Sequence, residues 1–201
     1  MAAVELRHIA QILPGHPFRS GLENHLQGGF IVVQPRDLGP DGRVDLASAV
    51  RQRTLPGLAP TFLHERDIVL QPRGTRFSAA LFGGTEVTAV AAAPLCIIRV
   101  DRARAQPEYV LAMLLSPSTQ TTLRQAAVGT YVPQVSRQAI ENLRIELPDL
   151  TTQTRLANLA ALGRRERELM DRLRDARARF YELVLAEAAK KSPEAHERSR
   201  A

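Results

Sequence analysis

The sequence predicts an α+β protein: a globular domain with a twisted, largely antiparallel sheet, followed by a long C-terminal coiled-coil-forming helix. Short apolar runs separated by turn residues fill residues 1–150, and a seven-residue apolar repeat follows them. With 201 residues, 44% of them hydrophobic, the chain can bury one core and still have that helix left over. We expect a globular domain over residues 1–150, a pairing helix over 151–190 and a disordered tail over 191–201.

The strand predictions rest on apolar runs bounded by turns. The runs are residues 30–33, 68–70, 79–82, 87–90 and 95–100, and a further short strand is expected before the Leu147-Pro148 step. Glycine and proline residues at 39–42, 72–74 and 83–84 supply turns between them. After Pro107 the apolar residues recur at helical spacing, which predicts a change from strands to helix.

The C-terminal helix has an apolar stripe at the 3,4 spacing with which two helices interlock. On a seven-residue frame the stripe consists of Leu159, Leu162, Leu169, Leu173, Ala176, Phe180 and Leu183, interrupted only by Glu166. Thr151 or Thr152 can cap the start of this helix. At about 1.5 Å per residue, roughly 36 helical residues reach about 54 Å. We expect the stripe to pair with a helix of a second copy or of another protein. Packing within this chain is the alternative.

Composition limits the classes of partner. The net charge is +6, and nearly all of the positive charge is arginine because Lys190 and Lys191 are the only lysines. Such a charge is compatible with nucleic-acid binding without deciding for it. The single cysteine, Cys96, lies in an apolar run, so we expect it in the core and expect no internal disulfide. Residues 1–20 contain no apolar core of signal-peptide length, and no later stretch approaches about 20 apolar residues, so we expect a cytoplasmic protein without a membrane partner.

Several enzyme classes fail for lack of residues. Metal-dependent nucleases usually need clustered carboxylates and a lysine on a strand, but neither lysine lies in the predicted domain. Gly83-Gly84 lacks the spacing and the following helix of a methyltransferase cofactor loop. The five histidines have no metal-ligand spacing, and no serine sits in a glycine elbow. The sequence therefore predicts no catalytic residues and no metal site.

Five segments follow one another in the order of a known family. Residues 6–18 resemble its opening helix and glycine turn, 33–38 its early strand, 65–74 (ERDIVLQPRG) a strand that begins at Asp and ends at Gly, 107–116 the helix that follows, and 129–148 the loop and strand before a spacer helix. The chain thus resembles half of a specificity (S) subunit of a type I restriction-modification system. Thr152-Gln153 stands where the family typically has Glu-Gln.

Family members usually have two target recognition domains and two spacer helices, whereas this chain has one of each. The resemblance implies that residues 1–150 form a target recognition domain. It also implies that two copies pair through their helices and read a symmetric, interrupted DNA site. Pairing with a different half-subunit, or a truncated relic, is the alternative.

Recognition of base edges requires forked donors such as Arg and amides such as Gln, placed on loops that a sheet holds. The candidate DNA-binding residues are Gln71, Arg73, Thr75 and Arg76 on one loop; Thr130, Tyr131, Gln134, Ser136 and Arg137 on another; and Arg51 and Arg53, which form a third group with Gln52 between them. Arg102 and Arg104 form a fourth polar group. Tyr131 is expected to pack or to bond a phosphate. For any single arginine, a solvated surface role is the alternative.

The resemblance implies a non-catalytic subunit that binds double-stranded DNA and docks a DNA methyltransferase (modification) subunit. That partner would bring S-adenosylmethionine and methylate adenine, while this chain holds no cofactor. Restriction would add a translocating nuclease subunit. Two other classes remain open: a coiled-coil adaptor or regulator of the methyltransferase without base readout, and an uncharacterised enzyme.

Overall fold

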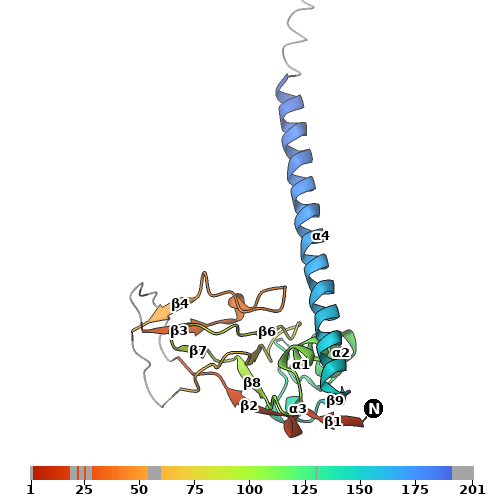
Figure 1. The fold of residues 1–201 in the computed structure, drawn as a ribbon. Coiled ribbons are helices and arrows are strands. Elements are labelled where there is room, and N and C mark those ends of the chain that lie inside the picture. The colour runs from red at the N-terminus through yellow and green to blue at the C-terminus, as the bar shows by residue number, and fades with distance from the viewer. Residues whose placement is uncertain are drawn as a thin grey trace, which may run out of the picture. The chain divides into compact units, whose positions relative to one another are not determined.

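The computed structural model describes residues 2–18, 22, 25, 29–53, 60–129 and 131–191 (Figure 1). The chain divides into two compact units, residues 1–162 and residues 163–201, which we describe separately. The first unit contains the strands and short helices of the described residues and the start of the long helix α4 (Leu150–Lys191). The described part of the second unit is the remainder of α4. The predicted α+β class with a long C-terminal helix is confirmed.

A two-stranded sheet joins the start of the chain to the residues before α4. β1 (Ala2–Glu5) runs antiparallel to β9 (Arg144–Leu147), with Val4 opposite Ile145. β9 confirms the short strand expected before Pro148. β1 is too short and too rich in alanine to stand out in the sequence, and its pairing with β9 defines it.

A four-stranded antiparallel sheet forms the centre of the first unit. Its strands, in spatial order, are β2 (Ala10–Pro14), β8 (Cys96–Val100), β5 (Ile68–Leu70) and β6 (Ala79–Leu81). All three residues of β5 are buried, because this inner strand is covered on both faces. Cys96 is buried as predicted, and burial raises the pKa of its thiol to about 12.

The helix expected within residues 6–18 is wrong. Leu6–His8 form a single 3-10 turn, η1, and β2 follows it. In β2 the buried residues Ala10 and Ile12 flank the exposed Gln11, which is the two-residue period of a strand.

A three-stranded sheet lies next to the four-stranded one. Its order is β4 (Val50–Gln52), β3 (Phe30–Val33) and β7 (Ala89–Ala91), with β3 antiparallel to β4 and parallel to β7. Ile31 of β3 shares an apolar cluster with Val69 of β5 and Ile97 of β8, so the two sheets pack on a common core. The strand expected over residues 33–38 is wrong beyond Val33, because Pro35–Asp37 form a 3-10 turn, η2.

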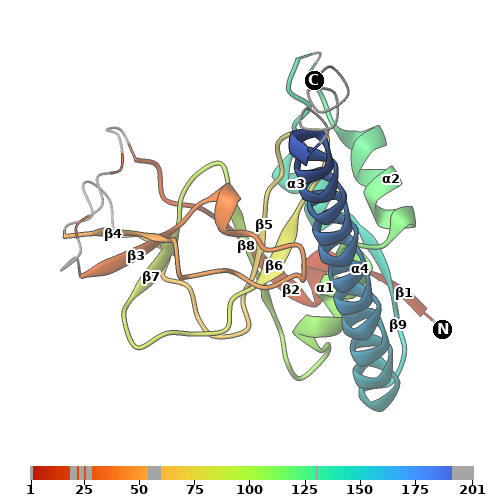
Figure 2. The same cartoon turned by 90° about the horizontal axis from the view of Figure 1, so that it is seen from above.

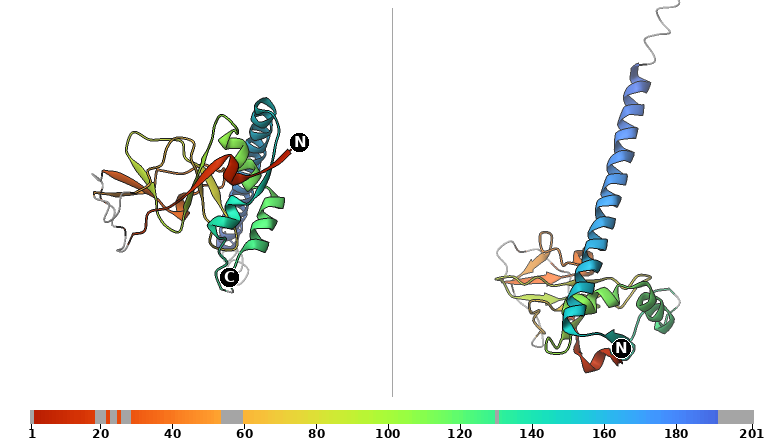
Figure 3. Two further views of the ribbon diagram at one scale, coloured as in Figure 1. Left: turned by 90° about the horizontal axis from the view of Figure 1, so that it is seen from below. Right: turned by 45° about the vertical axis from the view of Figure 1, so that its right-hand side comes forward.

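Three short helices lie at one end of the first unit. They are α1 (Pro107–Leu114), α2 (Pro117–Ala126) and α3 (Arg137–Glu141), and α1 confirms the helix predicted after Pro107. The hydroxyl oxygens of Ser116 and Ser136 cap α2 and α3. In Figures 2 and 3 the three helices lie at one end of this unit and β3, β4 and β7 at the other.

Two side chains fix the first turn of α4. The Asp149 carboxylate accepts hydrogen bonds from the Thr152 amide at 2.9 Å and from the Thr152 hydroxyl at 2.7 Å, and these bonds lower its pKa. Asp149 is therefore the cap, and the prediction of Thr151 or Thr152 is wrong. Gln153 is 1% exposed; its side-chain oxygen accepts from the Gln106 amide at 2.9 Å and its side-chain nitrogen donates to the Pro148 carbonyl at 2.8 Å. Because Gln106 immediately precedes α1, Gln153 ties the start of α4 to the start of α1.

The tail expected over residues 191–201 lies outside the described residues, apart from Lys191, where α4 ends.

Candidate nucleic-acid interface

Residues 71–76 and 128–136 form two loops that lie side by side, and we call them the paired loops. Backbone hydrogen bonds join them, from the Gly74 amide to the Pro133 carbonyl at 2.8 Å and from the Val135 amide to the Pro72 carbonyl at 2.9 Å. Arg73 also forms a β-bridge with Gln134. The structure thus brings together two loops that the sequence predicted separately, and it holds them through their backbones.

The second of the paired loops is also closed on itself. The amide of Val128 donates to the carbonyl of Gln134 at 3.0 Å, and the amide of Gln134 donates to the carbonyl of Val128 at 2.9 Å. Gly129 begins the turn with φ +118°, a backbone conformation that side chains larger than hydrogen rarely adopt. The two backbone segments that flank the tip of this loop are therefore hydrogen-bonded to each other.

Three predicted residues use their side chains to hold this region. The Gln71 amide nitrogen donates to the Arg73 carbonyl at 2.9 Å. The Ser136 hydroxyl oxygen accepts from the Ala139 amide at 3.1 Å. Arg137 pairs with Glu141 at 2.7 Å along α3. These side chains are therefore partly occupied before any ligand binds.

Four other predicted residues point polar groups outward. The side chains of Arg73, Thr75, Arg76 and Gln134 are exposed and make no hydrogen bond or ion pair with any other described residue. Two guanidinium groups, one hydroxyl and one amide thus extend from the hydrogen-bonded backbone of the paired loops and remain available to a ligand. Phosphates and base edges in DNA require such groups.

Tyr131 does not pack against its own chain. Its exposed fraction is 99%, so the expectation of packing is wrong, and the expected phosphate contact stays a prediction. Its neighbours Val128 and Val132 are 79% and 51% exposed. Thr130, also predicted to bind DNA, lies outside the described residues.

The third and fourth predicted groups lie elsewhere. Arg51 is within β4 and Arg53 directly follows it, at the end of the first unit away from α3 (Figures 2 and 3). The structure therefore does not bring them to the paired loops. Arg104 donates to the His8 carbonyl at 2.8 Å and lies 3.5 Å from the Asp101 carboxylate, so its guanidinium is held against the backbone, while Arg102 is exposed.

Two ion pairs that the sequence did not predict support the strand leading into the first paired loop. Asp67, 3% exposed, accepts from Arg99 at 3.0 and 2.7 Å and from the His64 amide at 2.8 Å. Arg66 donates to both carboxylate oxygens of Glu108 on α1, at 2.9 and 2.5 Å. These contacts hold Arg66 and Asp67, the two residues that directly precede β5. They join residues far apart in the sequence, so only the three-dimensional structure reveals them.

Within each ion pair, each partner stabilises the ionised form of the other. The hydrogen bond to Glu108 raises the pKa of Arg66, and the hydrogen bond to Asp67 raises that of Arg99. Burial alone would raise the pKa of Glu108, but the hydrogen bonds and charge of Arg66 outweigh burial and lower it.

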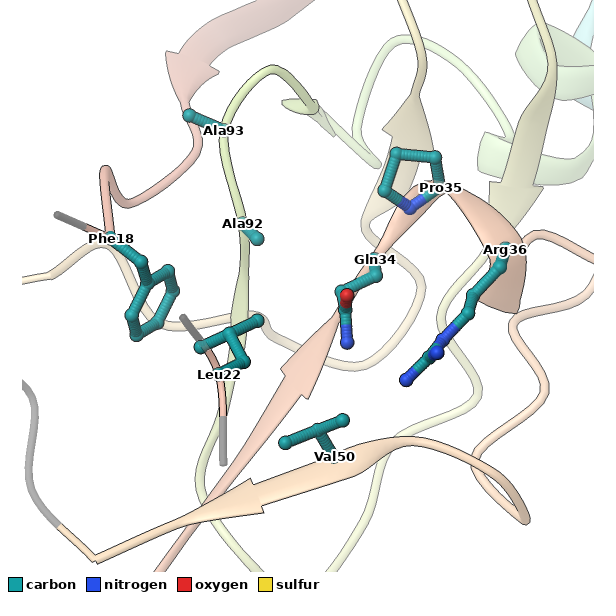
Figure 4. Close-up of a pocket in the computed structure, with 8 residues that line it drawn as sticks. All are labelled: Phe18, Leu22, Gln34, Pro35, Arg36, Val50, Ala92 and Ala93. Atoms are coloured by element: carbon teal, nitrogen blue, oxygen red, sulfur yellow. The ribbon is translucent and has the colours of Figure 1, made fainter. Parts of the chain in front are cut away.

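An open hollow of about 380 Å³ lies beside β3 (Figure 4), and no residue of the paired loops lines it. Gln34 points into it between Val50 and Arg36, with Phe18 and Leu22 on the far side. The Gln34 side-chain oxygen accepts from the Asp37 amide, whereas its nitrogen is buried without a partner among the described residues. Burial raises the pKa of the neighbouring Asp37 carboxyl. No sequence pattern indicated this feature.

The predicted stripe on α4 is exposed along its length. The exposed fractions of its large members run from 48% at Leu169 to 70% at Leu183, and Ala176 is exposed as well. Leu156, Met170 and Val184, which widen the stripe on one side, are also exposed. These side chains are therefore accessible to a partner helix, and the pairing itself stays a prediction.

Within the described part of the chain, histidine, cysteine and carboxylate side chains form no group of three that could hold a metal ion. None of the helices described, α4 included, could serve as a membrane span.

No family model and no curated protein sequence matches the chain. Solved structures do match. The HsdS subunit from Thermoanaerobacter tengcongensis has 16% identity and a TM-score of 0.57, over 86% of this chain and 39% of that one. A chain from a structural study of complex assembly and conformational transition of the type I restriction-modification system has 22% identity and a TM-score of 0.69, over 94% of this chain and 48% of that one.

A third match is the S subunit of a type I restriction-modification system from M. genitalium, with 13% identity and a TM-score of 0.57, over 96% of this chain and 46% of that one. This chain has the fold of half an S subunit. It spans less than half of the length of each of these three chains.

Proposed function

We propose that this chain is a half-length S subunit: a non-catalytic, sequence-specific DNA-recognition subunit of a type I restriction-modification methyltransferase complex. Each chain would recognise one half-site of double-stranded DNA. The observation that carries the proposal is the pair of loops, which a backbone frame holds together on an S-subunit fold.

The chemistry of the paired loops suits base recognition. The guanidinium groups of Arg73 and Arg76 can donate in pairs to the O6 and N7 atoms of guanine or to phosphate oxygens. The amide of Gln134 can donate to and accept from adenine. Because these side chains have no partners among the described residues, binding breaks no internal hydrogen bond.

The partner of the DNA-bound half-subunit would be a modification subunit, which supplies S-adenosylmethionine and the adenine methyltransferase activity. Where restriction accompanies modification, a translocating nuclease subunit would join the complex. Such a complex acts on DNA in the cytoplasm.

A second copy of the chain would bind along the stripe of α4. If the two helices run antiparallel, the stripe matches itself: Leu159, Leu162, Glu166 and Leu169 of one copy face, in turn, Leu183, Phe180, Ala176 and Leu173 of the partner subunit. A parallel pair in register would place Glu166 against Glu166 of the partner subunit, two like charges in the seam. Antiparallel pairing avoids this, and it makes a two-fold interface in which each copy presents the same surface.

DNA binding by the full chain tests the proposal. Arg73→Ala with Arg76→Ala should weaken binding and reduce the slope of log affinity against log salt by about 0.9 for each lost phosphate contact. Arg167→Ala with Arg174→Ala removes the same charge from exposed positions of α4 outside the stripe and is the matched control. Unchanged affinity and site choice in the loop variant would favour the adaptor function instead.

A further inference from the structure

The tip of the second paired loop exposes a set of apolar side chains that the chain itself does not use. Tyr131 is 99% exposed, Val128 79% and Val132 51%. Single exposed apolar residues are common, but three within five residues form a local patch. A patch of this kind on a recognition surface indicates a contact with a ligand.

The backbone beneath this tip is fixed. The bridge between Val128 and Gln134 closes the loop, and hydrogen bonds from Gly74 and to Pro72 attach it to the first paired loop. Tyrosine has only two side-chain torsions to immobilise, so a tyrosine ring on a fixed loop backbone loses little conformational entropy on binding. The structure therefore presents Tyr131 as a preformed projection.

The positive charges around the tip indicate the class of ligand. Arg73 and Arg76 lie on the loop that is bonded to this one, and their guanidinium groups have no partners among the described residues. Arg137 follows on α3. The carboxylate of Glu141 is paired with Arg137. An apolar projection flanked by cations fits a polyanion with flat apolar faces between its charges, and double-stranded DNA is such a ligand.

We propose that Tyr131 and Val132 form a wedge that enters a base step of the bound DNA and partly unstacks it. The Tyr131 ring would stack on a base, while Arg73 and Arg76 hold the phosphates or base edges on either side. Apolar side chains that open a base step bend the duplex and create sequence preference through its deformability. This inference rests on the proposed DNA-recognition function.

The test uses the full chain and duplexes that carry its methylation motif, with 2-aminopurine placed at one position at a time. With the unaltered chain, fluorescence should rise severalfold at one step and little elsewhere. Tyr131→Ala should abolish that rise and weaken binding by about tenfold or more, in the range of base stacking on aromatic side chains. Tyr131→Phe should retain both properties, because the ring and not the hydroxyl stacks.

Tyr181→Ala is the matched control, since Tyr181 is also exposed but lies on α4. If Tyr131→Phe loses as much affinity as Tyr131→Ala, the hydroxyl bonds a phosphate and the wedge is wrong. If Tyr131→Ala binds DNA normally but no longer co-purifies with the modification subunit, the tip is a protein contact and the wedge is also wrong. Failure of the unaltered chain to bind any duplex would instead overturn the proposed function, so the two failures are distinguishable.

Discussion

Gln153 is a polar side chain on which the geometry of two helices depends. It is buried at the start of α4 and bonds both the amide of Gln106 and the carbonyl of Pro148. In the sequence, Gln153 matches the second residue of the family's usual Glu-Gln pair, and only Thr152 before it differs. Its structural role follows from contact with a residue far away in the chain, which no local pattern contains.

Replacing Gln153 should be costly because it leaves a backbone donor and a backbone acceptor without partners. We expect Gln153→Ala to lower the free energy of unfolding by about 2 kcal/mol. Urea titration followed by circular dichroism at fixed protein concentration measures the change. Gln138→Ala, at an exposed position of α3, should change it by less than about 0.5 kcal/mol. Equal losses in the two variants would contradict the role of Gln153.

The pair between Arg66 and Glu108 should make stability depend on pH. The pKa of Glu108 in the folded chain lies below its ordinary value of 4.5, so the stabilisation is fully present above that value and is lost as pH falls through the folded pKa. We expect Glu108→Gln to be less stable than the unaltered chain at pH 7. Solvent screening limits the difference to about 1 kcal/mol, because 38% of the Glu108 side chain is exposed.

Urea midpoints measured from neutral pH down to acid pH check this dependence. The difference between Glu108→Gln and the unaltered chain should shrink as the carboxyl becomes protonated. Glu182→Gln, on an exposed position of α4, should show no such convergence. A difference that stays constant at all pH values would mean that packing, and not charge, is responsible.

At the scale of elements, the sequence predicted those whose local pattern is strong. β3, β5, β6, β7 and β8 are apolar runs, and α1 and α4 have helical spacing. β1, β2 and β4 were missed because none of them is a continuous apolar run bounded by turn residues, and because strand pairing rather than composition defines them. The same reason explains the candidate interface: the polar loops could be found from sequence, but their backbone bonding and the exposure of Tyr131 could not.

The stripe of α4 should govern association. We expect Leu173→Asp with Phe180→Asp to abolish pairing, because it places charges at two seam positions of each copy. Light scattering coupled to size-exclusion chromatography should report half the mass of the unaltered chain. Arg167→Asp with Arg174→Asp introduces aspartates outside the seam and should leave the mass unchanged. Identical masses for the unaltered chain and the seam variant would contradict pairing through α4.

For the whole molecule, two-fold pairing predicts the form of the DNA target. In cells that express this chain with a modification subunit, methylated adenines should lie in a split, palindromic motif that disappears without this chain. Sequencing of methylated adenines measures this directly. An asymmetric motif would indicate a different half-subunit as the partner, and a motif that persists without this chain would rule out a recognition role.

The length of the paired helices should set the gap in that motif. Duplicating residues 167–173 adds one seven-residue repeat with leucine at both seam positions and preserves the stripe, so the half-sites should move apart by about 10 Å, or roughly three base pairs. Inserting four residues at the same place shifts the stripe and should prevent pairing instead. An unchanged gap after the seven-residue insertion would mean that α4 does not separate the half-sites.

The frame of the paired loops also bears on how such a protein changes in evolution. Main-chain atoms join the loops, and several of the outward side chains take no part in holding them. Substitutions at Arg73, Thr75, Arg76 or Gln134 can therefore alter the chemistry presented to DNA without disturbing the scaffold. If the loops recognise DNA as proposed, single codon changes at these positions would give access to new target sequences. In a two-fold assembly each such change alters both halves of the target at once.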